Sequence, residues 1–122
     1  INFFSGEIVA FFGEEMNLQI AQGGLRVKRP SFPVSPNDKV KLVVRPESIN
    51  LVDAGKEEGR VENMIEGRIE VAMYIGSIIR YTIRSGEQII YVDRSDPEHA
   101  GIFQEGSRVG LILKKEIHMF KV

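Results

Sequence analysis

Cysteine is absent from the 122-residue sequence, and no apolar run approaches the ~20 residues that a membrane-spanning helix needs. Without cysteine the chain cannot form disulfide bonds or thiolate metal sites, a composition typical of a reducing compartment. The basic excess of most nucleic-acid-binding proteins is also missing, because the formal net charge is -1. With 43% hydrophobic and 27% charged residues, the remaining composition is that of an ordinary globular domain.

The clearest pattern in the sequence is a two-residue alternation of apolar and polar side chains within residues 67–94. A period of two is typical of a β-strand with one buried face. Gly76 and Ser77 interrupt the first strand, and Ser85-Gly86 indicates a tight hairpin turn because glycine accepts positive φ angles. Ile89–Val92 then returns as a partner strand. The stretch predicts an antiparallel meander.

Short strands of this kind recur along the whole chain, and no apolar helical period lasts three turns. Short strands joined by glycine turns favour an all-β fold of small OB-like β-barrels, because barrel closure removes exposed sheet edges. The polar segment 53–60 is a candidate linker or hairpin tip between an N-terminal OB-like half, 1–52, and a second module, 61–122. We expect two OB-like pieces that share one elongated barrel. The side chains expected to point inward are Ile69, Val71, Met73, Ile75, Tyr81, Ile83, Val109 and Leu111.

The first twelve residues are apolar on both faces of the expected strand. The faces carry Phe4, Ile8 and Phe12 on one side, and Phe3, Val9 and Phe11 on the other. Such a strand is either covered on both sides or bends at Gly6 and changes face. Its spare phenylalanines could pack on another domain or pair with a second copy, since closed two-fold dimers are the commonest oligomers. Replacing Phe3 or Phe11 with serine tests the second alternative.

No complete catalytic or cofactor-binding motif occurs in these 122 residues. The Gly55-Lys56 pair is followed by Glu57, and Asn50 stands where the first glycine of a phosphate-binding loop belongs. The densest group of possible metal ligands, which lacks the ordered spacing of a calcium loop, is Asp93, Asp96, Glu98 and His99. We therefore predict no enzymatic activity, no metal site and no cofactor for this stretch of chain.

A small basic group beside an aromatic residue keeps a nucleic-acid-binding OB module open as one alternative. The group consists of Arg26, Lys28, Arg29 and Phe32. This alternative requires further aromatic residues on the same barrel face, because isolated charges usually form a solvated surface. A small-molecule or anion sensor is a second alternative, and it requires a concave site between the two halves.

Four short stretches, spread over nearly the whole chain, carry a family resemblance. Asn2–Glu7 resembles the NFFEG stretch, and Val44–Ile49 the RPEDI signature, of the C-terminal extension in ATP-binding subunits of ABC importers. Gly67–Tyr81 is similar to the core of the TOBE module in that extension. Gly106–Leu113, followed by Phe120, resembles the closing strand and terminal aromatic. Each motif is short, so the resemblance rests on their order and spacing.

The resemblance implies a non-catalytic regulatory domain of an importer ATPase of the spermidine/putrescine, maltose or iron type. Such a domain contacts its counterpart across the ATPase dimer, while ATP and magnesium bind in a separate nucleotide-binding domain. The implied partners are that domain, a second copy of the subunit and, indirectly, the permease subunits, with no nucleic acid. The implied location is the cytoplasmic face of the cell membrane. A start at Ile1 fits a fragment, and the single repeat seen in the sequence argues against the anion site of relatives with paired modules.

The Arg45-Pro46-Glu47 sequence has two interpretations. Proline fixes its own φ and biases Arg45 to an extended conformation, so the motif can be a structural corner that ends a strand. The resemblance instead allows a regulatory contact. The positions expected to serve a regulatory role or an interface are Arg45, Glu47, Tyr74, Gly76, Ser77, Tyr81, Phe3 and Phe11.

Overall fold

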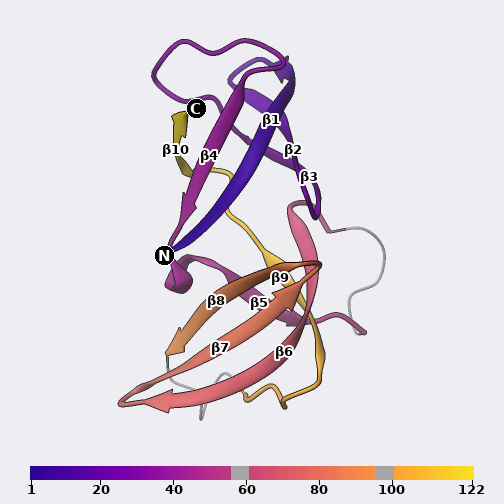
Figure 1. Cartoon of the computed structure of the whole chain (residues 1–122), viewed down its shortest axis with the longest axis vertical. Helices are drawn as coiled ribbons and strands as arrows, with labels where there is room; N and C mark the ends of the chain where they lie inside the picture. The colour runs from indigo at the N-terminus through magenta and orange to yellow at the C-terminus, as the bar shows by residue number, and fades with distance from the viewer. Residues whose placement is uncertain (56–60, 96–100) are drawn as a thin grey trace.

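The computed structural model describes residues 1–55, 61–95 and 101–122 (Figure 1). The regular structure of these residues is β apart from one 3-10 turn, which confirms the all-β prediction. The elements are β1 (Asn2–Phe12), β2 (Glu15–Ile20), β3 (Gly23–Lys28), β4 (Lys39–Val44), η1 (Pro46–Ser48), β5 (Asn50–Asp53), β6 (Met64–Ile75), β7 (Ile78–Ser85), β8 (Gln88–Ser95), β9 (Arg108–Ile112) and β10 (His118–Lys121).

The strands form two five-stranded antiparallel sheets, which lie one above the other in Figure 1. Sheet A has the order β10-β4-β1-β2-β3, and sheet B has the order β5-β9-β6-β7-β8. Each sheet takes one edge strand from the other half of the chain, because β5 pairs with β9 and β10 pairs with β4. Neither 1–52 nor 61–122 completes a sheet alone. The division of the chain at 53–60 stays a prediction, and residues 56–60 lie outside the described residues.

The two sheets are equivalent in strand order, with β1, β2, β3 and β4 corresponding to β6, β7, β8 and β9. The correspondence extends to the loops. The Ile8 amide donates to the Asp38 carbonyl at 2.9 Å, and the Ile69 amide donates to the Ser107 carbonyl at 3.0 Å. The expectation of a single repeat is therefore wrong. The equivalence lies mainly in backbone pairing, and the side chains that the two halves share are confined to the start of the two central strands.

One hydrophobic core runs through both sheets. Phe4 and Ile8 of β1 are buried in it together with Ile69 of β6. Tyr81 is the largest fully buried side chain, and its ring meets Phe103 edge to face with centroids 6.1 Å apart. Because burial of apolar area contributes about 25 cal/mol per Å², a core shared by both sheets stabilises them as one unit.

The outer half of β6 presents the opposite face from the one that its sequence pattern predicted. Ile69 lies opposite Ile83, but the next pair is Val71 with Thr82, so Glu70 is the extra residue of a β-bulge. A bulge shifts the alternation by one position, and side chains beyond it exchange faces. Three residues predicted to point inward are therefore exposed: Val71 (40%), Met73 (55%) and Ile75 (42%). The other five predictions are confirmed as buried: Ile69, Tyr81, Ile83, Val109 and Leu111.

A second bulge changes the face of β1. The pairing with β2 shifts between Ile8 and Ala10, so the strand changes face there and not at Gly6. Phe11 consequently packs against the core. Phe3 is 52% exposed, which shows that the strand is not covered on both sides within this chain.

The proline-rich stretch 30–36 contains no strand, because proline lacks the backbone N–H that a central strand needs. Phe32 and Val34 pack from it against the core. The last strand, β10, forms one edge of sheet A.

Candidate functional site

Two asparagines tie each sheet to the edge strand of the other. Asn63 donates its amide to the Arg26 carbonyl at 2.8 Å and accepts from the Arg26 amide at 2.7 Å, on the edge of β3. Asn2 makes the same pair of bonds with the backbone of Tyr91 in β8, both at 2.8 Å. A carboxamide that donates and accepts in this way replaces a neighbouring strand. Both asparagines are buried, and Asn63 holds a φ of 60°.

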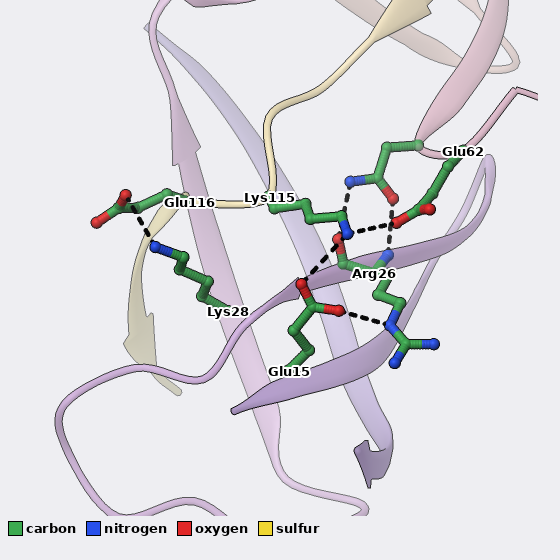
Figure 2. A network of polar contacts seen from close by, with 7 residues as sticks. Glu15, Arg26, Lys28, Glu62, Lys115 and Glu116 are labelled. Atoms are coloured by element: carbon green, nitrogen blue, oxygen red, sulfur yellow. Dashed lines mark hydrogen bonds and ion pairs between the residues drawn. The ribbon is translucent and has the colours of Figure 1, made fainter. Parts of the chain in front are cut away.

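A charged network lies beside this contact and joins three segments of the chain (Figure 2). Lys115, between β9 and β10, reaches Glu15 of β2 and Glu62 before β6, each at 3.2 Å. Glu15 also accepts from Arg26 at 2.8 Å. Hydrogen bonds from Arg26 and then Lys115 lower the pKa of Glu15, while Glu62 and then Glu15 raise the pKa of Lys115. Two carboxylates therefore engage the one ammonium group, which leaves it poorly suited to bind an anion.

A hollow of about 790 Å³ lies where the β2–β3 turn approaches the β7–β8 turn and the start of β6. An amide chain borders it: Gln88 donates to the Phe3 carbonyl at 2.6 Å, and Gln22 donates to Gln88 at 2.7 Å. The charged side chains that line the hollow are Glu66 and Glu87. The concave site that the sensor alternative requires is therefore present between the halves, but its acidic lining disfavours an anion.

The outer side of sheet B carries an apolar surface, which we call face B. It consists of Val71, Met73, Ile75, Ile78, Thr82 and Tyr91. Cross-strand pairing places Val71, Thr82 and Tyr91 in one row across β6, β7 and β8. The row beside it contains an ion pair in which Arg80 donates to both carboxylate oxygens of Asp93, at 2.7 and 2.8 Å. Asp93 raises the pKa of Arg80 through this hydrogen bond, and the bidentate contact neutralises the guanidinium within the face.

The outer side of sheet A carries a second apolar surface, which we call face A. It consists of Phe3, Lys41, Val43, His118 and Phe120. Pairing aligns Phe3, Val43 and His118 in one row, with Lys41 and Phe120 in the next row along. Phe3 and Phe120 are both about half exposed. Among the described residues no carboxylate pairs with Lys41, so face A carries a net positive charge where face B does not.

The predicted interface positions of the meander divide between the surface and the core. Gly76 and Ser77 form the turn at the tip of the β6–β7 hairpin, where Gly76 has a φ of 59°. Tyr74, beside that turn, is 63% exposed. Tyr81 is fully buried, and its hydroxyl accepts a hydrogen bond from the Phe103 amide at 3.1 Å. Tyr74 is therefore open to a partner, whereas Tyr81 belongs to the core.

The Arg45-Pro46-Glu47 sequence forms the corner at η1, which packs against β8. Arg45 is extended, with φ -75° and ψ 142°, and Pro46 is buried. Glu47 is exposed, and it is the last of the groups that raise the pKa of Arg80, after Asp93 and Tyr91. The corner interpretation therefore describes Pro46, and a regulatory role for Arg45 and Glu47 stays a prediction.

The predicted basic group does gather aromatic side chains. The Arg29 guanidinium lies 4.0 Å from the ring centroid of Phe11, and that of Arg26 lies 4.8 Å from the centroid of Phe12. Arg26 and Lys28 each also form an ion pair with a glutamate. Carboxylates thus engage Arg26 and Lys28, whereas Arg29 stacks on a ring and keeps its charge. Two of the three cations are therefore less available to phosphates, which weakens the nucleic-acid alternative.

The described residues contain no group of three or more side chains able to hold a metal ion. Of the four candidates from the sequence, Asp93 is engaged by Arg80. Asp96, Glu98 and His99 lie outside the described residues. Within the described part of the chain, no helix is long and apolar enough to cross a membrane.

Residues 42–119 match the TOBE domain, and this match covers more than half of the sequence. The chain therefore belongs to the TOBE domain family. Its fold is similar to a structure of the cytoplasmic molybdate-binding protein ModG with molybdate bound, at a TM-score of 0.76 and 15% sequence identity. That likeness covers 97% of this chain and 94% of the ModG chain, and it concerns the OB-like fold. A search of curated proteins finds no match.

Proposed function

We propose that this TOBE domain is a non-catalytic regulatory and dimerisation domain of the ATP-binding subunit of an ABC importer. The observation that carries the proposal is the pair of apolar sheet faces left uncovered on a unit whose core is complete. Contiguous apolar patches of this kind are typical of protein–protein contact sites. The four ordered stretches of the sequence support the same assignment.

The proposed partners are the nucleotide-binding domain of the same subunit and a second copy of the subunit, with the permease subunits as indirect partners. ATP and magnesium would bind in the nucleotide-binding domain, and the TOBE domain would hold no cofactor. The proposed location is the cytoplasmic face of the cell membrane. The transported solute would belong to the polyamine, sugar or iron classes that the resemblance implies.

Oxyanion binding is a second candidate function, favoured by the full-length fold likeness to a molybdate-binding protein. The two equivalent sheets also remove the argument that a single repeat makes an anion site doubtful. The charges argue against it. Lys115 is held between Glu15 and Glu62, and the hollow between the sheets is lined by Glu66 and Glu87.

Two solution measurements on the 122-residue chain test the proposal. Calorimetry with Mg-ATP should detect no binding, because the sequence lacks a phosphate-binding loop. Sedimentation at tens of micromolar should detect reversible self-association. Saturable micromolar binding of Mg-ATP would contradict the non-catalytic role. A strict monomer at about 1 mM, a concentration above the dissociation constants expected of a weak interface, would contradict dimerisation.

A further inference from the structure

We propose that face B is the surface through which this chain pairs with a second copy, about a two-fold axis that passes near the middle strand β7. The inference rests on the proposed function, because it names the contact surface of the dimer proposed above. Face A would then be left for a different partner.

The apolar side chains of face B are continuous along β6, while on β7 and β8 the Arg80–Asp93 ion pair lies between the apolar rows. Neighbouring strands lie about 4.8 Å apart, and residues two apart on one strand lie about 7 Å apart. Val71 and Thr82 are therefore direct neighbours, as are Thr82 and Tyr91. The bulge at Glu70 turns Val71, Met73 and Ile75 of β6 outward. The apolar side chains point outward because the bulge shifts the alternation of the strand by one position, and bulges are specific structural features that re-aim side chains.

Charge decides between a second copy and an unrelated partner. A two-fold contact places one surface against itself, so that surface must be self-complementary. On the outer side of sheet B, Arg80 pairs with Asp93 and Arg84 pairs with Glu70, so each of these two cations is neutralised by its own neighbour. On face A, two copies would bring the unpaired Lys41 side chains together, and like charges repel. Face B therefore suits a second copy, and face A suits a surface that carries carboxylates.

The size of face B sets the expected affinity. Three strands by three rows cover a surface about 10–15 Å wide and 15–20 Å long. The total buried area, counting both copies and a rim, then falls below the ~1,200 Å² that separates weak from standard interfaces. We expect a reversible dimer with a dissociation constant on the order of 10–100 µM.

The first test compares two equally exposed apolar residues on opposite sheets. Met73→Glu introduces a carboxylate on the β6 side of face B, opposite Arg80, whereas Phe3→Glu introduces one on face A. The side chains are 55% and 52% exposed, so both variants should keep the wild-type melting temperature. Sedimentation equilibrium should show at least a tenfold weaker dimer for Met73→Glu, because the contact would remove one carboxylate of each copy from water, and an unchanged constant for Phe3→Glu.

The second test uses the absence of cysteine from the chain. Thr82 lies on the middle strand of face B, and the residue that corresponds to it in sheet A is Asn17, opposite Ala10. Thr82→Cys should form a disulfide-linked dimer under mild oxidation, because residues near a two-fold axis face their own copies. Asn17→Cys should remain monomeric on a non-reducing gel.

Each outcome decides a separate point. A dimer that survives Met73→Glu and is lost in Phe3→Glu would overturn the assignment of face B while leaving the proposed dimerisation intact. Equal cross-linking of the two cysteine variants would also overturn it. A wild-type chain that stays monomeric throughout the concentration series would overturn both the surface and the dimerisation role.

Discussion

The two sheets share one strand order but use equivalent strands differently. In sheet A, the central strand β1 ends at Phe12, where Arg26 covers the ring. In sheet B, the central strand β6 continues through Tyr74 to Ile75 and gives the hairpin an exposed apolar tip. The backbone pattern is thus held constant while the outer side chains diverge. One strand order thus supports two different outer surfaces, so the strand order alone does not determine what either surface binds.

The largest effect should come from deleting residues 118–122, which removes β10 from sheet A. Met119 is buried and β10 pairs along β4, so we expect a loss of about 3–5 kcal/mol in the free energy of unfolding. Urea denaturation measures this loss, and hydrogen exchange should locate it in β4. A loss of hydrogen-exchange protection confined to sheet B would contradict the pairing of β10 with β4 of sheet A.

Replacing the two edge-binding asparagines, Asn63 and Asn2, should lower the free energy of unfolding by different amounts. Asn63→Ala removes two hydrogen bonds and places alanine at a φ of 60°, so we expect a loss of about 2–4 kcal/mol. Asn2→Ala removes an equivalent pair of bonds without that strain and should cost about 1 kcal/mol less. Chemical denaturation of both variants gives the comparison. A smaller loss of stability for Asn63→Ala than for Asn2→Ala would contradict the expected strain of alanine at a φ of 60°.

The equivalent glycines Gly6 and Gly67 provide a matched pair. A Cβ atom on Gly67 would lie 2.5 Å from Ile83 Cγ2 and 3.0 Å from the Arg84 carbonyl, whereas a Cβ atom on Gly6 finds Ile20 at 3.5 Å. We expect Gly67→Ala to cost about 1–3 kcal/mol through overpacking and Gly6→Ala to stay within about 0.5 kcal/mol. Thermal unfolding of the two proteins distinguishes these values, and equal costs would count against the tighter packing of sheet B.

The smallest effect concerns pH and the link through Lys115. The folded-state pKa of Glu15 is lowered from 4.5, so its contribution is present above pH 4.5 and is lost as pH falls through the folded value. The pKa of Lys115 is raised from 10.5, so its contribution is present below pH 10.5 and is lost as pH rises through the folded value. The melting-temperature difference between wild type and Glu15→Gln should therefore shrink on acidification below pH 4.5. A melting-temperature difference that stays constant down to pH 2 would contradict a stabilising contribution from the ionised Glu15 carboxylate.

Periodicity predicted most strands of this fold because each sheet buries one face of each strand. It did not predict the bulges at Glu70 and between Ile8 and Ala10, because a bulge depends on the pairing partner and leaves the local composition unchanged. The exchange of β5 and β10 was missed for a similar reason, since partners distant in sequence decide it. Faces A and B both follow from these non-local features, so neither could be assigned from the sequence.

One missed feature did have a signal in the sequence. Asparagine, an apolar residue, glycine and isoleucine recur with the same spacing at the start of both central strands. The two sets are Asn2, Phe4, Gly6, Ile8 and Asn63, Ile65, Gly67, Ile69. In the structure each of these sets supplies an edge-binding asparagine and a buried isoleucine. A search for internal repeats would have found the pair and predicted two equivalent sheets.

A protein-contact domain and an oxyanion-binding domain give opposite results in one calorimetric titration. Sodium molybdate is titrated into the 122-residue chain at pH 7, with ModG, described as a molybdate-binding protein, as the positive control. We predict no saturable heat from this chain up to millimolar molybdate, because Lys115 is engaged by Glu15 and Glu62. Saturable binding at micromolar molybdate would contradict that prediction and establish anion binding as the function of the fold.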